Sequence, residues 1–115
     1  MTDTTELVAE WLPLPDVAEA LGLDILRTRQ LVRDRQLLAV RREGILYVPA
    51  AFVQDGQVLK SLPSVLNLLG DAKYTDEECL GWLFTADESL PGTPVQALRE
   101  NRGTEIKRRA QALGF

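Results

Sequence analysis

The chain has 115 residues and a formal net charge of -4, with 45% hydrophobic and 26% charged residues, a mixture typical of one globular domain or a compact pair of subdomains. It contains no histidine and one cysteine, Cys79, which excludes zinc sites and histidine-activated catalysis, so we predict neither an enzyme nor a cofactor. No apolar run approaches the roughly 20 residues of a membrane span, and the acidic start MTDTTELVAE lacks a secretory signal, so we expect a cytoplasmic protein with no membrane partner.

Two short helices joined by a tight turn are predicted in the first third of the chain. The first takes about two turns from Leu14, because Pro15 favours a first helical turn and Gly22 favours a left-handed end. Asp24 is a natural N-cap for the second helix, which we expect at residues 24–35. A short connection that contains glycine is typical of the helix-turn-helix motif.

The two faces of the second helix differ in chemistry. The inner face is mostly apolar, while the outer face and the flanks carry arginines and a glutamine that can meet phosphates or base edges. The inner side chains are Thr28, Leu31, Val32 and the stem of Arg35, and the outer ones are Leu26, Gln30 and Arg33, with Arg27 and Arg29 on the flanks.

A β-hairpin is predicted directly after the second helix. Two β-prone runs within residues 38–48 flank a turn that contains Gly44, and Pro49 ends the second run. A hairpin in this place is the wing of a winged helix-turn-helix. Its tip carries Arg41 and Arg42, which can reach a DNA backbone or a minor groove.

The second half of the chain predicts a small helical module. Residues 52–59 contain an Asp-Gly turn and form either a second short hairpin or an irregular connector. Helix start signals follow at Ser61, at the capping box that begins with Thr75, and at Thr93. We expect helices at about 64–69, 76–84, 93–101 and 105–113, the last with an inner stripe of Ile106, Ala110 and Leu113 and exposed bases at Lys107, Arg108 and Arg109.

The expected fold class is therefore mainly α with a small β-hairpin wing, that is, a winged helix-turn-helix, plus a C-terminal helical module. We expect a flexible N-terminal arm at 1–13, the winged helix-turn-helix at 14–60 and the helical module at 61–115. Cys79 lies on an apolar helix position and is expected to be a buried small hydrophobe.

Charge is distributed unevenly along the sequence. Residues 1–24 contain six acids and no base, whereas residues 25–42 contain six arginines and one acid. Residues 43–98 are again acidic, and residues 99–115 are basic. A concentrated basic segment in an acidic chain attracts a phosphate backbone, but the same arginines could also pair with the neighbouring acidic segments. Charge alone leaves both interpretations open.

Local motifs in the first half match a known pattern. Residues 21–24 read LGLD, residues 37–41 read LLAVR and residues 48–49 read VP. This pattern resembles the winged helix-turn-helix of the MerR and excisionase type. Ile25 and Leu26 depart from it, because such proteins often carry polar residues there.

A longer resemblance covers most of residues 14–115. The matching motifs are LLAVRR at 37–42, GQVLKSLP at 56–63, WLFT at 82–85 and RRAQA at 108–112. They resemble a family of small actinobacterial winged-helix DNA-binding proteins with an appended helical C-terminal domain. The resemblance implies DNA binding through the winged module and control by a serine/threonine kinase through the N-terminal tail. The candidate phosphorylation sites are Thr2, Thr4 and Thr5.

A third resemblance is limited to residues 82–115, which are similar to the C-terminal domain of Xre, MbcA and ParS-type antitoxins. Such domains mediate protein contacts. This third resemblance supports an alternative function, a protein-interaction module of antitoxin or adaptor type. Such a module would use the winged fold as a scaffold, and its arginines would contact an acidic partner.

The favoured hypothesis is a DNA-binding protein that regulates transcription and lies on the nucleoid when bound. The helix at 24–35 enters the major groove and the hairpin at 38–48 is the wing. Because one winged module covers a small area, a homodimer is a candidate assembly. The residues expected to contact double-stranded DNA are Arg27, Arg29 and Arg33, on phosphates or guanine edges, Gln30, on adenine, and Arg41 and Arg42, on the flanking backbone.

Overall fold

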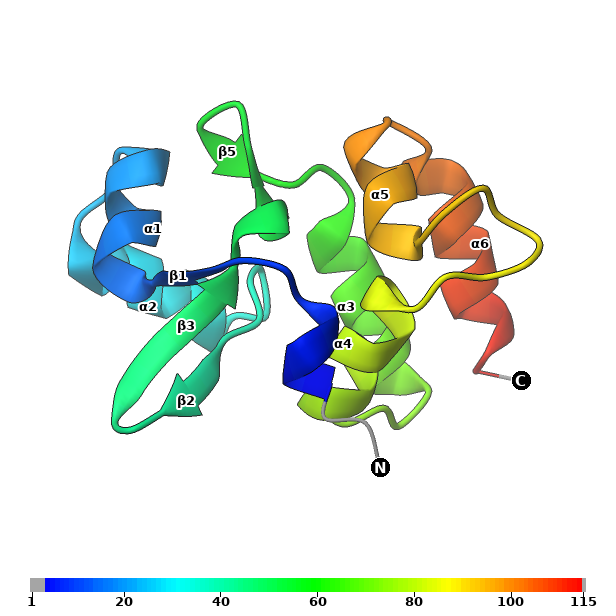
Figure 1. Ribbon diagram of the computed structural model, residues 1–115, viewed down its shortest axis with the longest axis horizontal. Coiled ribbons are helices and arrows are strands. Elements are labelled where there is room, and N and C mark those ends of the chain that lie inside the picture. Colours follow the sequence, from blue (N-terminus) through cyan, green and yellow to red (C-terminus); the bar gives the residue numbers. More distant parts are fainter. Residues whose placement is uncertain (1–3, 115) are drawn as a thin grey trace.

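The computed structural model describes the backbone of residues 4–114, which extends 37 × 31 × 25 Å along its principal axes. Figure 1 shows two halves side by side, with α1, α2 and the strands on the left and α3 to α6 on the right. The expected fold class is confirmed. In the described residues the elements are η1 (Thr4–Leu7), β1 (Trp11–Pro13), α1 (Leu14–Leu21), α2 (Ile25–Arg33), β2 (Val40–Arg42), β3 (Ile45–Pro49), η2 (Ala50–Phe52), β4 (Val53–Gln54), β5 (Gln57–Val58), α3 (Leu62–Asp71), α4 (Asp76–Phe84), α5 (Pro94–Arg99) and α6 (Gly103–Ala112), where η marks a 3-10 helix.

The predicted helix-turn-helix is formed by α1 and α2. Gly22 ends α1 with φ 68°, a left-handed conformation that glycine adopts readily, and its N–H donates to the carbonyl oxygen of Glu19 at 3.2 Å. Asp24 caps α2, since its Oδ1 accepts the N–H of Arg27 at 2.7 Å. Thr28 is fully buried and its hydroxyl donates to the carbonyl oxygen of Asp24 at 2.9 Å, which anchors the start of α2.

The second helix ends earlier than predicted, at Arg33 rather than at Arg35. Asp34 is the C-cap, and Arg35 takes a left-handed conformation with φ 57°. This reversal directs Leu37 and Leu38 into the core, where both are buried. Burying two leucine side chains is worth roughly 3–6 kcal/mol, more than the roughly 1–2 kcal/mol that a left-handed arginine costs.

β3 is the central strand of a three-stranded antiparallel sheet with the order β1-β3-β2. β2 and β3 form the predicted wing hairpin, in which Val40 lies opposite Tyr47 and Arg42 opposite Ile45. The turn between the strands places Glu43 at φ 52° and Gly44 at φ 80°, the positive values that a two-residue hairpin turn of type I′ requires.

Residues 4–13 differ from the expected flexible arm and are named here the N-terminal strap. Trp11–Pro13 pair with β3 as strand β1, with Trp11 opposite Pro49, and η1 packs against α4. In Figure 1 this segment, in dark blue, runs from α4 across to the sheet. A strand of three residues shows no pattern in the sequence, because it forms only where β3 offers an open edge.

The connector after the wing adopts the first of its two predicted forms. β4 and β5 make a second short hairpin in which Val53 lies opposite Val58. The predicted capping box is also present at the start of α4: the Thr75 hydroxyl accepts the N–H of Glu78 at 3.1 Å, and the Glu78 carboxylate accepts the N–H of Thr75 at 3.0 Å.

Three details of the helical module differ from the sequence prediction. α3 runs through Gly70 to Asp71, since a glycine in the last turn costs only about 1 kcal/mol and the helix buries four apolar side chains. α6 begins at Gly103, and Leu113 lies beyond its end with 39% exposure instead of on the inner stripe.

α3 and α6 have ten residues each, and no helix in the described part of the chain has the length and apolar character needed to cross a bilayer.

One hydrophobic core joins the two halves. The fully buried ring of Phe52, at the end of η2, lies 5.7 Å from the ring of Phe84 in α4, measured between centroids. The guanidinium of Arg99 in α5 donates to the carbonyl oxygens of Ala51 at 2.8 Å and Val53 at 3.1 Å. Apolar and polar contacts therefore connect the wing side of the molecule to the helical module.

The thiol of Cys79 is buried in this core, as predicted. Burial raises the pKa of the thiol, and the positive charge of Arg35, which acts in the opposite direction, is the smaller effect. At about pH 8 we expect a disulfide dye to label the folded protein at least roughly tenfold more slowly than the urea-unfolded chain, because the thiolate is both scarce and covered. Dye absorbance over time measures both rates. Equal rates would contradict the burial.

Candidate nucleic-acid interface

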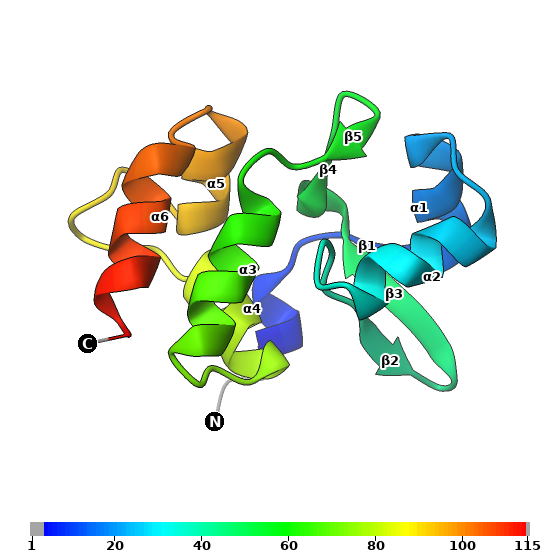
Figure 2. The same ribbon diagram turned by 180° about the vertical axis from the view of Figure 1, so that it is seen from behind.

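α2 and the wing lie next to each other at one end of the molecule (Figure 2). An open cleft of about 610 Å³ separates them. Its walls include Arg29 and Arg33 from α2, Arg41 from β2, and the apolar side chains of Ile25 and Ile45. The fold therefore brings three of the six predicted DNA-contact residues to one cleft.

The other two predicted arginines lie outside this cleft. Arg27 is exposed in the first turn of α2. Arg42 lines a separate hollow of about 300 Å³ beside Trp11 and Tyr47. Arg41 and Arg42 are successive residues of a strand, so their side chains point to opposite faces of the hairpin. The wing thus presents one arginine to the cleft and one to its far side.

These five arginines carry charges that the described part of the protein does not neutralise. All five are exposed, and the ion pairs found among the described residues instead involve Arg35, Arg102 and Arg109. Of the two interpretations that the sequence left open, pairing with the neighbouring acidic segments does not occur at these positions. These exposed guanidinium groups are therefore available to an anionic partner.

Gln30, the sixth predicted contact, is held in a chain of hydrogen bonds on the exposed side of α2. Its Oε1 accepts from Nη2 of Arg33 at 3.1 Å, and its Nε2 donates to Oδ1 of Asp34 at 2.9 Å. Both ends of the amide are occupied, so reading an adenine requires these bonds to be exchanged for base contacts. Asp34 is a member of this surface that the sequence reasoning missed, although its spacing of four residues from Gln30 could have indicated the pair.

Arg35 has a different environment from the other arginines of this segment. Its Nη1 lies 2.9 Å from Oδ1 of Asp76, at the start of α4, and its Nη2 lies 4.0 Å from Sγ of Cys79. The hydrogen bond and charge of Asp76 raise the pKa of Arg35 further. The Arg35 side chain therefore points toward the protein interior, as predicted. Its backbone, however, lies after the end of α2 and has a left-handed conformation.

Replacing Arg35 with alanine is expected to lower the free energy of unfolding by about 0.2–1 kcal/mol, the usual range for a partly exposed ion pair, and to leave the salt dependence of DNA binding unchanged. The side chains of Arg35 and Asp76 are 35% and 57% exposed, which limits the loss. A double-mutant cycle with Asp76→Ala, measured by urea unfolding, isolates the pair. A reduced salt slope for Arg35→Ala would contradict this placement.

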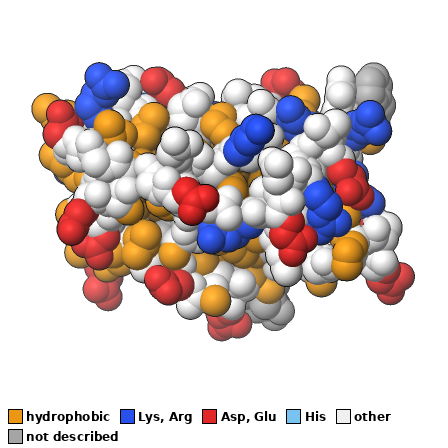
Figure 3. All heavy atoms as spheres, turned by 90° about the horizontal axis from the view of Figure 1, so that it is seen from above, with side chains coloured by type: hydrophobic (Ala, Val, Ile, Leu, Met, Phe, Trp, Pro, Cys, Tyr) orange, Lys and Arg blue, Asp and Glu red, His pale blue; other side chains and the backbone are white. Residues whose placement is uncertain are grey.

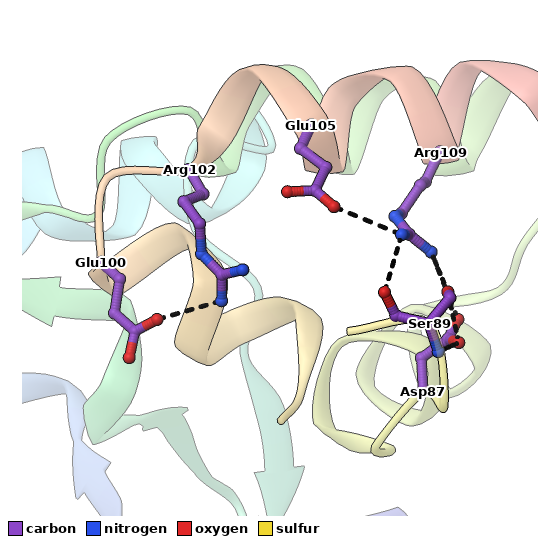
Figure 4. A network of polar contacts seen from close by, with 6 residues as sticks. All are labelled: Asp87, Ser89, Glu100, Arg102, Glu105 and Arg109. Atoms are coloured by element: carbon purple, nitrogen blue, oxygen red, sulfur yellow. Dashed lines mark hydrogen bonds and ion pairs between the residues drawn. The ribbon is translucent and has the colours of Figure 1, made fainter. Parts of the chain in front are cut away.

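Two arginines at the C-terminal end of the chain, Arg102 and Arg109, form internal ion pairs (Figure 4). The guanidinium of Arg109 lies 3.7 Å from Oδ2 of Asp87 and 3.3 Å from Oε1 of Glu105. The N–H and hydroxyl of Ser89 donate to Oδ1 of Asp87 and lower the pKa of that carboxyl. In Figure 3, acidic and basic side chains are interspersed over this end of the molecule. Arg102 and Arg109 thus have acidic partners within the protein, unlike the five arginines of α2 and the wing.

The candidate phosphorylation sites fall at the beginning of the chain. Thr2 lies outside the described residues. Thr4 and Thr5 are the first two residues of η1, which packs against α4. These two threonines thus belong to the N-terminal strap, and their phosphorylation stays a prediction.

Comparison with known families divides the sequence into two matched regions. Residues 2–53 match the family profile described as "DNA-binding protein Rv2175c, wHTH domain", where wHTH stands for winged helix-turn-helix. Residues 59–114 match the profile described as "Rv2175c C-terminal domain of unknown function". The resemblances to MerR and excisionase proteins and to antitoxin domains stay predictions.

Individual proteins give the same result. The "DNA-binding protein Rv2175c" of Mycobacterium tuberculosis H37Rv is 42% identical in sequence, and the match covers 89% of this chain and 79% of that protein. The NMR structure of Rv2175c superimposes with a TM-score of 0.82 at 39% identity and covers 92% of this chain and 82% of that one. The chain therefore belongs to the Rv2175c family, in which a winged helix-turn-helix domain is followed by a C-terminal domain of unknown function.

Proposed function

We propose that this protein binds double-stranded DNA, with α2 in the major groove and the β2–β3 hairpin as the wing, and that it regulates transcription. The observation that carries the proposal is the set of five exposed arginines on α2 and the wing that form no ion pair in the described part of the chain. Phosphates supply the negative charge that these side chains lack within the protein.

The arrangement of the arginines fits a duplex. A major groove about 12 Å wide admits one α-helix, and the first residues of such a helix reach the base edges. Arg29, Arg33 and Arg41 surround the cleft between helix and wing, where a sugar-phosphate strand that borders the groove can lie. Arg42, on the far face of the hairpin, is then free to contact the next stretch of backbone or a minor groove.

The family supports the same function. The relative from Mycobacterium tuberculosis carries DNA binding in its name, and the match to it includes most of this chain. Regulation of transcription is a further step of the proposal, supported by the usual use of the helix-turn-helix motif in regulators. A serine/threonine kinase that acts on the threonines at the start of the chain stays part of the proposal.

A homodimer belongs to the proposal as well. One winged module of this size buries only roughly 600–1,000 Å² on DNA, and tight specific binding usually takes two such modules. Two modules related by a twofold axis would recognise half-sites separated by about one helical turn, 10–10.5 base pairs, or a multiple of it.

Fluorescence anisotropy of mixed genomic duplex fragments with the full chain tests the proposal. At about 50 mM salt we expect binding, and at about 200 mM salt an affinity up to roughly 500-fold lower if all five arginines contact phosphates. No binding at the lower salt concentration would refute it. In that case, a protein partner that co-purifies from native extract and survives nuclease treatment would favour the protein-interaction alternative.

A further inference from the structure

Leu26 is the most exposed large apolar side chain in the described part of the chain, with 69% of its surface accessible. The remaining exposed side chains of this kind range from 36% for Ile25 to 47% for Ile45. α2 is attached to the protein through other residues, the fully buried Thr28 and the half-buried Leu31. Leu26 therefore contributes little to folding, and its apolar surface is available to a partner.

The position of Leu26 within α2 places it at the groove floor in the proposed complex. It is the second residue of the helix, and the spacing to Gln30 and Arg33 puts all three on one exposed face. The first residues of a recognition helix contact base edges, while residues on its flanks contact phosphates. Arg27 and Arg29 lie on these flanks. Around the helix axis Leu26 lies between the two arginines, so its side chain approaches the bases.

We propose that Leu26 contacts the 5-methyl group of a thymine and that the sequence preference of this protein depends on that methyl group. The inference rests on the proposed DNA binding. In the major groove the thymine methyl is an apolar group among hydrogen-bond donors and acceptors, and apolar side chains contact it. Against any other base, the leucine would cover polar atoms that lose water without gaining a bond.

The charges around Leu26 favour DNA over a second copy of this chain as the occupant of the face. Arg27, Arg29 and Arg33 form no ion pair within the described residues. Two such faces brought together would place like charges opposite each other, which is destabilising. A duplex offers phosphates to the arginines and a methyl group to the leucine at the same time.

The test begins with selection of a preferred duplex from a random DNA pool by the full chain. Each thymine of the recovered sequence is then replaced in turn with deoxyuridine, which removes only the methyl group. For the natural chain we expect one replacement to lower the affinity about fourfold, the value of one buried methyl group. The variant Leu26→Ala should bind the thymine and deoxyuridine duplexes equally well.

Leu113→Ala is the matched control, because Leu113 is also exposed, at 39%, but lies beyond the end of α6. It should retain the fourfold preference for thymine. The inference is overturned if the selected sequence requires no thymine, if no deoxyuridine replacement weakens binding by the natural chain, or if Leu26→Ala keeps the preference. In each of these three outcomes the protein still binds DNA, so the proposed function stands. Absence of any DNA binding would overturn both the thymine contact and the proposed function.

Discussion

Replacement of Arg33 and Arg42 together with alanine is expected to weaken DNA binding roughly 30-fold at about 0.15 M salt and to reduce the slope of log affinity against log salt by roughly 1.8. The physical reason is the release of about one counterion for each phosphate that an arginine neutralises. Both side chains are exposed and form no ion pair in the described structure, so their loss leaves no buried charge behind. Anisotropy titrations at four or more salt concentrations measure the slope.

A matched control comes from α6. Lys107→Ala with Arg108→Ala removes the same number of positive charges from the opposite half of the molecule, where neither side chain forms an ion pair in the described structure. This double variant should change the slope far less than the first. If the two double variants reduce the slope equally, the DNA does not distinguish the winged end from the helical end, and the assignment of the face to α2 and the wing is wrong.

Phe52→Ala is expected to have the largest effect on stability, a loss of about 3–5 kcal/mol from the free energy of unfolding. Phe52 is fully buried at the junction of the two halves and contacts Phe84 across it, with 5.7 Å between ring centroids. A domain of this size has a stability of about 5–15 kcal/mol in total, so the variant stands close to unfolding.

The two tryptophans of the chain make the consequence measurable in each half. Trp11 is in β1 and Trp82 in α4, so the variants Trp82→Phe and Trp11→Phe each leave one fluorescent reporter. In urea, we expect Phe52→Ala to shift the transitions of both reporters by the same amount, because one core joins the halves. A shift of one reporter alone would show that the halves unfold separately. The exposed Leu113→Ala is the control and should shift neither by more than a few tenths of a kcal/mol.

Features that depend on a few neighbouring residues could be predicted from the sequence. The left-handed Gly22, the Asp24 cap and the Thr75 capping box are all local, because the hydrogen bonds that define them join residues three or four positions apart. The wing hairpin is local in the same sense, since its turn and both strands lie within about ten residues. These features were sufficient to predict the helix-turn-helix and the wing.

Features that depend on distant contacts could not be predicted in this way. β1 exists because β3, more than thirty residues later, offers an edge for it, and Arg35 leaves the helix to meet Asp76, 41 residues away. For the candidate interface, the sequence identified which arginines are present but not which share a cleft. The opposite directions of Arg41 and Arg42 could have been predicted from the alternation of side chains along a strand.

The N-terminal strap has a consequence for the solubility of the protein. β1 pairs with residues 47–49 of β3 along one edge, and β2 pairs with residues 45–47 along the other, so every residue of the central strand has a partner on at least one side. Without Trp11–Pro13, residues 47–49 of β3 would lose their partner on that edge, and an unpaired apolar edge is a template on which other chains add as aggregates. β2, at the opposite border, carries two arginines, and charged edges resist such pairing. The short strand at the start of the chain therefore protects against aggregation.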